Sequence, residues 1–310
     1  MDAMVHQPVL LEEALTGLAI QEAGHYIDCT FGRGGHSRAI LQRLGTEGRL
    51  LALDKDPQAV GSPQAIALSS DPRFILEQSD FSQLKEIVSQ CGWVGKVQGI
   101  LMDLGVSSPQ LDDPQRGFSF LQEGPLDMRM NPNVGASAAD WLITVGEKEL
   151  ADVIYRYGEE RYSRRIARAI VEQRKKTPLT STRQLAELIE RAVPRKDKFK
   201  HPATRTFQAI RIFINRELES LEKGLAQAVE VLAPGGRLAV ISFHSLEDRI
   251  VKQFFRLESR GRPLPKGLPV PDSETALRLK LLGKKRPDKT EVAANPRARS
   301  AILRIAERLC

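Results

Sequence analysis

Residues 27–37 of this 310-residue chain are Ile27-Asp28-Cys29-Thr30-Phe31-Gly32-Arg33-Gly34-Gly35-His36-Ser37, and this stretch decides the fold. The pattern predicts a strand over 24–30, a glycine turn and then a helix over 37–44. Another predicted strand, 49–54, also ends in an acid, Asp54. Glycines allow the backbone to approach a ligand closely, and an acid that closes the next strand can bind a ribose. The stretch therefore predicts a site for a nucleotide-like cofactor.

Strand and helix patterns continue to alternate up to residue 104. Further strands are predicted at 74–77 and 97–104, with helical segments at 57–68 and 81–91. This rhythm predicts an open, doubly wound α/β sheet. The strand pattern returns at 237–243, and two late segments, 277–282 and 300–306, are candidates for a closing hairpin.

The middle of the chain breaks this rhythm. Residues 105–135 are rich in Gly, Pro, Asp and Ser and predict a long loop, which in a compact domain is usually functional. Helical patterns follow at 138–142, 147–157, 163–175, 182–193 and, as one long helix, 204–232. We therefore expect an all-helical domain, residues 113–215, inserted into an α/β domain that comprises residues 1–112 and 216–310.

The composition is that of a soluble globular protein, with 41% hydrophobic and 27% charged residues. No apolar run approaches the roughly 20 residues that a membrane span needs, and residues 1–8 lack the layout of a signal peptide. The three cysteines are widely spaced and fit neither a disulfide framework nor a zinc site. We therefore expect a cytoplasmic protein without a metal centre; its oligomeric state cannot be predicted from the sequence.

The net charge of +7 is concentrated in one segment. Residues 160–216 contain sixteen Lys/Arg and five Asp/Glu, whereas the rest of the chain contains 30 basic and 34 acidic side chains. Such asymmetry favours a polyanion partner, above all nucleic acid, over the alternative of solvated helix faces. The candidate phosphate contacts are Arg164, Arg165, Arg168, Arg174, Lys175, Lys176, Arg195, Lys196, Lys198 and Lys200, with Lys284, Lys285 and Arg286 as a possible extension.

The glycine turn departs from the dinucleotide fingerprint G-x-G-x-x-G, because Ser37 stands at the last glycine position. Asp28 precedes the turn and would repel a pyrophosphate, whereas it would attract the cationic groups of S-adenosylmethionine. Asp54 suits the ribose of either cofactor, and Asp103 ends the predicted strand 97–104. Three acids at three strand ends favour S-adenosylmethionine over NAD. Each acid alone could instead cap a helix, the interpretation we prefer for Asp56.

The chain resembles the RsmH (MraW) family, the bacterial 16S rRNA cytosine-N4 methyltransferases. The resemblance rests on blocks that span nearly the whole chain in the family's order: 6–11 (HQPVLL), 28–37 (DCTFGRGGHS), 103–110 (DLGVSSPQ), 116–120 (RGFSF), 126–130 (LDMRM), 157–160 (YGEE), 201–209 (HPATRTFQA), 243–249 (FHSLEDR) and 295–297 (NPR). It implies a class I S-adenosylmethionine-dependent methyltransferase with an inserted helical domain. It also implies a target cytidine in the decoding region of 16S rRNA, within the small ribosomal subunit.

The resemblance further implies that Gly34, Gly35, His36, Asp54, Phe81, Asp103 and Gln110 contact the cofactor. To these the residue pattern adds Asp28 and Gly32, which flank the start of the turn. Phe81 follows the predicted strand 74–77 and is placed to flank an adenine.

The loop after Asp103 is the candidate acceptor site. Methylation of an exocyclic amine is an in-line displacement that depends mainly on positioning. An acceptor near the amine can also stabilise positive charge that develops on its nitrogen. We expect Asp103 to organise the site and Ser107 or Ser108 to touch the base.

The sequence leaves the roles of Phe118, Phe120 and His244 undecided. Phe118 and Phe120 could stack on a flipped base or simply anchor the loop by packing. His244 could face the cofactor pocket or hydrogen-bond the neighbouring backbone, and Ser245 is the expected cap of the helix that follows it. Two other functions also remain: an NAD-dependent oxidoreductase, and a non-catalytic ribosome-assembly factor with a cofactor fold.

Overall fold

The computed structural model describes residues 8–195, 201–261 and 277–310, so the predicted contacts at Lys196, Lys198 and Lys200 lie outside the described residues. The chain forms two compact units. One, the sheet unit, consists of Met1–Gly105 and Leu218–Cys310, and the other, the helical unit, is Val106–Glu217.

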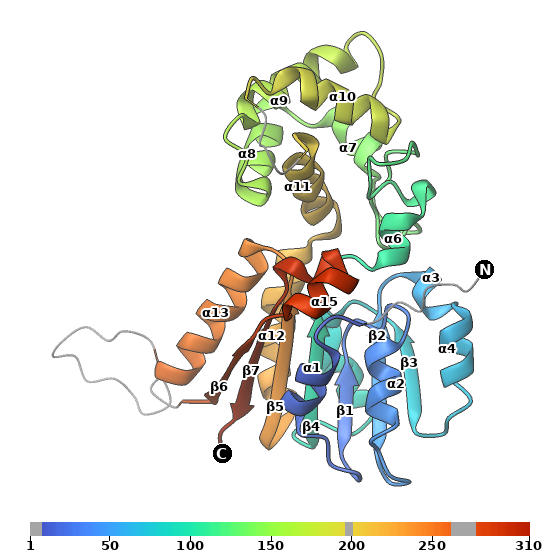
Figure 1. Cartoon of the computed structure of the whole chain (residues 1–310), viewed down its shortest axis with the longest axis vertical. Helices are drawn as coiled ribbons and strands as arrows, with labels where there is room; N and C mark the ends of the chain where they lie inside the picture. Colours follow the sequence, from blue (N-terminus) through green and yellow to red (C-terminus); the bar gives the residue numbers. More distant parts are fainter. Residues whose placement is uncertain (1–7, 196–200, 262–276) are drawn as a thin grey trace, which may run out of the picture. The chain divides into compact units, whose positions relative to one another are not determined.

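The sheet unit is built on seven strands in the order β3-β2-β1-β4-β5-β7-β6 (Figure 1). The strands are β1 His25–Asp28, β2 Arg49–Asp54, β3 Phe74–Gln78, β4 Val97–Asp103, β5 Leu232–Ser242, β6 Leu279–Lys285 and β7 Ile302–Arg308. The first five are parallel to one another, and β7 is antiparallel to both β5 and β6. The predicted doubly wound sheet is confirmed, and the late segments do pair, although a helical segment separates them.

Both faces of this sheet are covered by helices, because the side chains of its strands are apolar on both faces. Along β2, for example, Leu50 and Ala52 belong to one core cluster and Leu51 and Leu53 to the other. The first cluster includes side chains of α1 (Leu11–Leu18) and α2 (Gly35–Leu41). The second includes side chains of α5 (Leu84–Gln90), α12 (Glu217–Val231) and α13 (Ser245–Arg260). The alternation follows from the two-residue period of a strand.

Short elements fill the edge at which the parallel strands end. They are α3 (Pro57–Val60), α4 (Pro63–Leu68), the 3₁₀ helix Phe81–Gln83, α15 (Lys289–Ala294) and the 3₁₀ helix Pro296–Ser300. As expected, Asp56 caps α3, since its side chain accepts a hydrogen bond from the Gln58 N–H at 2.9 Å. Because parallel strands present their carboxyl ends at one edge, the acids that close β1, β2 and β4 share that edge.

The helical unit has its own core. Its helices are α6 (Ser108–Asp112), α7 (Ala138–Thr144), α8 (Glu147–Gly158), α9 (Ser163–Arg174), α10 (Thr182–Ala192) and α11 (Ala203–Asn215), with a 3₁₀ turn at Pro114–Arg116. The core draws on the loop as well as the helices, since Phe118, Leu126 and Met128 are buried in it. The loop is also pinned by Arg116, whose guanidinium donates to the backbone oxygens of Arg129 and Met130 at 3.1 and 2.8 Å.

One element prediction was wrong. Residues 204–232 do not form a single helix, because α11 ends at Asn215 and α12 begins at Glu217. Arg216 between them has a φ of 51°, a left-handed conformation that ends a helix. The apolar periodicity continues across the break, so periodicity alone could not locate it.

Candidate active site at the carboxyl edge of the sheet

The turn after β1 is organised by a buried carboxylate. Asp28 has no exposed surface; its Oδ1 accepts the Thr30 N–H at 3.1 Å, and its Oδ2 accepts the Ser37 hydroxyl at 2.7 Å. Ser37 is equally buried. The departure from the dinucleotide fingerprint thus has a structural reason. Ser37, at the last glycine position, links the start of α2 to the end of β1 through its hydrogen bond to Asp28. The missing glycine is visible in the sequence, whereas the hydrogen bond made by the serine that replaces it is not.

The glycines of the turn serve different purposes. A Cβ on Gly34 would lie 2.8 Å from the Phe31 ring and 2.9 Å from Leu68, and one on Gly35 would lie 2.3 Å from Pro8. These two glycines are therefore required by packing within the protein. A Cβ on Gly32 would meet only the Thr30 carbonyl at 3.9 Å, but its φ of 56° favours glycine. Only at Gly32 is the space beside the backbone open.

Asp54, at the end of β2, is bonded to the same turn. Its Oδ2 accepts the Gly32 N–H at 2.8 Å and its Oδ1 accepts the Asp56 N–H at 2.9 Å. Burial raises the pKa of Asp54 from 3.8 to about 6, although the two N–H donors oppose this rise. Each carboxylate oxygen can accept a second hydrogen bond. Asp54 can therefore receive a hydroxyl while it fixes the turn.

Asp103, at the end of β4, meets His36 of the glycine turn. The distance between His36 Nδ1 and Asp103 Oδ2 is 3.6 Å, and the Asp103 N–H donates to the Thr30 hydroxyl at 2.7 Å. Asp103 Oδ1 is buried and has no hydrogen-bond partner among the described residues. Burial, and then the nearby Asp28 and Glu247, raise the pKa of Asp103 well above its usual value. Thr30 was not singled out in the sequence, where a threonine inside a glycine turn gives no distinct signal.

Phe81 begins the 3₁₀ turn after β3 and packs against α12. A Cβ on Gly224 would lie 2.6 Å from the Phe81 ring, which is half-buried. The preceding Asp80 accepts from the Ser82 N–H at 2.8 Å, from Lys55 Nζ at 3.2 Å and from the Ser220 hydroxyl at 3.0 Å. Burial would raise the pKa of Asp80, but Lys55 and the Ser82 N–H outweigh it and leave the pKa lowered. Asp80 is a fourth acid at this edge that the sequence analysis missed.

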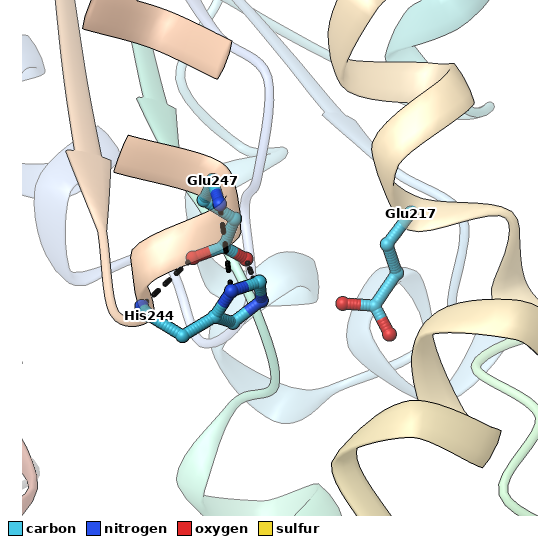
Figure 2. A group of neighbouring side chains, drawn as sticks. All are labelled: Glu217, His244 and Glu247. Atoms are coloured by element: carbon cyan, nitrogen blue, oxygen red, sulfur yellow. Dashed lines mark hydrogen bonds and ion pairs between the residues drawn. The ribbon is translucent and has the colours of Figure 1, made fainter. Parts of the chain in front are cut away.

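His244 caps α13, where Ser245 had been expected to do so. His244 Nδ1 accepts the Glu247 N–H at 3.4 Å, and Glu247 Oε2 accepts the Phe243 and His244 N–H groups at 2.8 and 3.3 Å. His244 Nε2 lies 3.1 Å from Glu247 Oε1 (Figure 2). Glu217, also drawn there, belongs to the helical unit, where both its oxygens accept from Arg211 at 2.8 Å. His244 thus has a structural role through Nδ1, whereas its buried Nε2 makes no hydrogen bond among the described residues.

The remaining predicted site residues lie in the helical unit. Ser107 is the N-cap of α6 and Ser108 is its first residue. Gln110 is buried, and its Oε1 accepts the Ser107 N–H at 2.9 Å. The structure thus brings Ser107 and Gln110 together, whereas Asp28, Gly32, Asp54, His36 and Asp103 converge within the sheet unit.

Two other predictions in the helical unit can be refined. Phe118 is buried in the core, so it is an anchoring residue, whereas Phe120 is only half-buried and contacts the His201 ring with centroids 4.6 Å apart. Arg174 donates to the backbone oxygens of Leu142 and Val145 at 2.6 and 2.7 Å. It thus has a structural role, whereas Arg164 and Arg165 on α9 are exposed.

The residues at the carboxyl edge fit a cationic, nucleoside-bearing cofactor. The acids Asp28, Asp54 and Asp103 come from three neighbouring strands, and Asp103 Oδ1 has unused acceptor capacity. Burial and the nearby Asp28 and Glu247 disfavour the ionised form of Asp103 and raise its pKa. A cation would favour the ionised form, whereas a pyrophosphate would add to the repulsion.

Comparison with known families identifies the chain. The model of the MraW methylase family matches residues 3–309. The chain belongs to this family. It is therefore a methyltransferase that uses S-adenosyl-L-methionine as its cofactor. The strand order is that of the class I methyltransferase fold. An NAD-dependent oxidoreductase is thereby set aside.

Solved structures resemble the chain only distantly. An rRNA methylase from Streptococcus thermophilus is 12% identical, with a TM-score of 0.45 and coverage of 99% of this chain and 100% of that one. The N-methyltransferase NodS from Bradyrhizobium japonicum WM9, in complex with S-adenosyl-L-homocysteine, is 9% identical, with a TM-score of 0.41 and coverage of 98% and 90%. At these values the likeness does not bear on substrate. Within the described ranges, no helix is both long and apolar enough to cross a membrane.

Proposed function

We propose that this protein transfers a methyl group from S-adenosyl-L-methionine to the exocyclic N4 amine of a cytidine in the decoding region of 16S rRNA. The observation that carries the proposal is the buried Asp103 Oδ1, which has no hydrogen-bond partner among the described residues and lies at the carboxyl edge of the sheet. An amine N–H is the complementary donor. The charge of residues 160–216 further supports an rRNA target, because this segment contains sixteen basic and only five acidic residues.

The bound cofactor supplies a methyl group activated by a sulfonium. On this proposal Asp54 accepts the ribose hydroxyls, Phe81 flanks the adenine, and the Gly32, Gly34, Gly35 and His36 turn, with Asp28 beneath it, faces the methionine part. Gln110 is a further cofactor contact that the family resemblance implies. A cation beside Asp103 lowers the pKa of its carboxyl, so the ionised form is present during catalysis.

Asp103 acts on the acceptor. Its carboxylate accepts an N–H of the amine and stabilises the positive charge that the nitrogen gains on methylation. It can then take the proton that the methylated amine must release. Ser107 or Ser108, in the loop that follows, contacts the base. Because Ser107 is also the N-cap of α6, its substitution affects both that cap and any base contact.

We further propose that the helical unit is an inserted RNA-recognition domain and that the protein acts in the cytoplasm, on rRNA within the small subunit. Exposed Arg164 and Arg165 on α9, together with Arg195, provide sequence-independent phosphate contacts. Phe120, half-buried beside His201, is the better candidate for base stacking, because Phe118 is committed to the core.

Transfer of labelled methyl groups to purified small subunits and to naked 16S rRNA tests this function. The proposal predicts one labelled N4-methylcytidine in at least one of these substrates. If the cofactor binds but neither substrate is labelled, the non-catalytic assembly factor becomes the better interpretation. In single-turnover assays, near-normal transfer by both Asp103→Ala and Ser107→Ala would remove these residues from the mechanism.

A further inference from the structure

A basic segment follows β6, the outermost strand of the sheet. It lies at the carboxyl edge, where we propose the cofactor site. Residues 284–299 contain six Lys/Arg and two Asp/Glu, within a sheet unit whose remaining sequence is acidic overall. The basic residues are Lys284, Lys285, Arg286, Lys289, Arg297 and Arg299, and all of them are exposed. Both acids have structural roles: Asp288 caps α15, and Glu291 Oε1 accepts the Leu10 N–H at 2.7 Å.

The strand register places this segment relative to Asp103. Asp103 of β4 is paired with Ile241 of β5, Ile241 with Leu303 of β7, and Leu303 with Lys285 of β6. Asp103 and Lys285 therefore lie in one row across four adjacent strands. With strands ~4.8 Å apart, this row spans about 14 Å. Because β6 is antiparallel to β7, which is antiparallel to β5, β6 ends at the same edge as β4 and β5.

The segment that follows β6 stays at this edge. Arg286, α15 and the 3₁₀ helix Pro296–Ser300 connect the end of β6 to the start of β7 (Figure 1). Glu291 of α15 bonds to Leu10, two residues after Pro8, which in turn packs on Gly35 of the glycine turn. The N-terminal segment thus ties the basic segment to the cofactor turn.

The cations at the end of β6 are not used to stabilise the fold. Among the described residues, no ion pair or hydrogen bond engages the side chains of Lys284, Lys285 or Arg286. Arg304, which is paired with Lys284 across the strands, differs in this respect, since it donates to both oxygens of Asp248 at 2.7 and 3.0 Å. Exposed like charges on successive residues repel one another, so a polyanion would relieve that repulsion.

We propose that Lys284, Lys285 and Arg286 form a phosphate-binding surface for the RNA strand that carries the target base, separate from the basic helical unit. The inference rests on the proposed rRNA substrate and adds a contact that positions it. A base with its amine at Asp103 has its backbone nearby, and a row about 14 Å long brings the flanking phosphates within reach of long Lys and Arg side chains. These contacts bind the backbone and carry no sequence information.

The test compares two double variants of the full chain. Lys284→Gln/Lys285→Gln removes two charges from the surface. Lys96→Gln/Lys223→Gln removes two exposed charges elsewhere in the sheet unit, since Lys96 precedes β4 at the opposite edge and Lys223 lies on α12. RNA affinity is measured against salt with a single-stranded fragment of 16S rRNA, methyl transfer is assayed on the same fragment, and calorimetry with S-adenosylmethionine checks the cofactor site.

We expect the surface variant to flatten the salt slope by roughly 1.4, or about 0.7 per lost single-strand contact, and so to weaken binding about 25-fold at 0.1 M salt if the two proteins bind alike at 1 M. The control variant should keep the wild-type slope, and both should keep the wild-type cofactor affinity. An unchanged slope in the surface variant, or an equal change in both variants, overturns the inference. If the surface variant keeps the RNA salt slope but no longer binds phosphatidylserine vesicles, the inference is also overturned, because the surface would then bind membranes and not RNA. If the wild type does not methylate rRNA at all, the proposed function itself fails.

Discussion

Charged side chains are used in opposite ways in the two units. In the sheet unit, Asp28 is fully buried and Asp54 and Asp103 are partly buried at the carboxyl edge. Both oxygens of Asp28 and of Asp54 accept hydrogen bonds, whereas one oxygen of Asp103 lies 3.6 Å from His36 and the other has no hydrogen-bond partner among the described residues. In the helical unit, Arg164 and Arg165 project from α9 into solvent. Buried acids can bind one small cation with defined geometry, whereas exposed cations suit a long, flexible polyanion. On the proposed function, the sheet unit binds the methyl donor and the exposed arginines of the helical unit bind RNA phosphates.

The largest expected effect comes from Asp103, whose buried Oδ1 has no hydrogen-bond partner among the described residues. Asp103→Asn keeps the shape but removes the charge that stabilises the developing cation, so single-turnover methyl transfer should fall by about 10²–10³-fold. Glu22→Gln, which removes an exposed charge ahead of β1, serves as the control and should be silent. Transfer by Asp103→Asn within a few-fold of wild type would mean that the carboxylate does not act on the amine.

The next effect concerns the exposed cations. Arg164→Gln/Arg165→Gln should flatten the salt slope by roughly 1.4, because two phosphate contacts are lost, and so weaken rRNA binding about 25-fold at 0.1 M salt if the two proteins bind alike at 1 M. Cofactor affinity should not change. The Lys96→Gln/Lys223→Gln control should bind RNA like the wild type. A double α9 variant that binds RNA with the wild-type slope would leave these arginines as solvated helix-face residues.

Asp54 should affect cofactor affinity and protein stability in opposite directions as the pH changes. Ribose hydroxyls donate to the ionised carboxylate, so cofactor affinity should fall as the pH drops below about 6, by up to tenfold per pH unit. The stability of the cofactor-free protein should respond in the opposite direction. The pKa is raised on folding from 3.8 to about 6, so the folded state binds this proton more tightly, and Asp54 lowers the free energy of unfolding as the pH rises through that window.

Asp54→Asn should reduce both pH dependences, and the part that remains is assigned to Asp103, whose pKa is also raised by burial. Calorimetry with S-adenosylmethionine and urea unfolding, each from pH 4.5 to 7.5, measure them. Identical profiles for the wild type and the variant would show that another group titrates in this range.

The smallest effect concerns Ser37, the residue that replaces the last fingerprint glycine. Ser37→Gly restores G-x-G-x-x-G but leaves one oxygen of buried Asp28 without its donor, which should lower the free energy of unfolding by roughly 1–3 kcal/mol. The variant should still not bind NADH. Ser70→Ala, which removes an exposed hydroxyl, is the control for urea unfolding. If Ser37→Gly were as stable as the wild type, the Ser37–Asp28 bond would not organise the turn.

Much of the fold was predictable because it depends on local patterns. Buried parallel strands appear as apolar runs, and each run that ended in Asp28, Asp54 or Asp103 proved to end at one edge of one sheet. The break at Arg216 was missed because a left-handed residue need not interrupt the apolar periodicity. The cap formed by Asp56 could also be predicted from the sequence, because the residue that donates to it lies only two residues away.

The site was predictable only in its residue types. The sequence pattern indicated which acids lie together, but not that Ser37 and Thr30 are their partners, because these contacts depend on the path of the turn. Asp80 was missed because it follows the end of β3 by two residues and shares its bonds with the distant Ser220. The row from Asp103 to Lys285 requires the register of four strands, two of them far apart in the chain, which no local pattern contains.

The most direct test of the account is mass mapping of methylated nucleosides in 16S rRNA from cells that lack this protein, complemented with the wild type or with Asp103→Asn. The account predicts that N4-methylation of one decoding-region cytidine disappears in the deletion strain, returns with the wild type and does not return with Asp103→Asn expressed at the same level. An unchanged N4-methylcytidine signal in the deletion strain, or full restoration by Asp103→Asn, would contradict it.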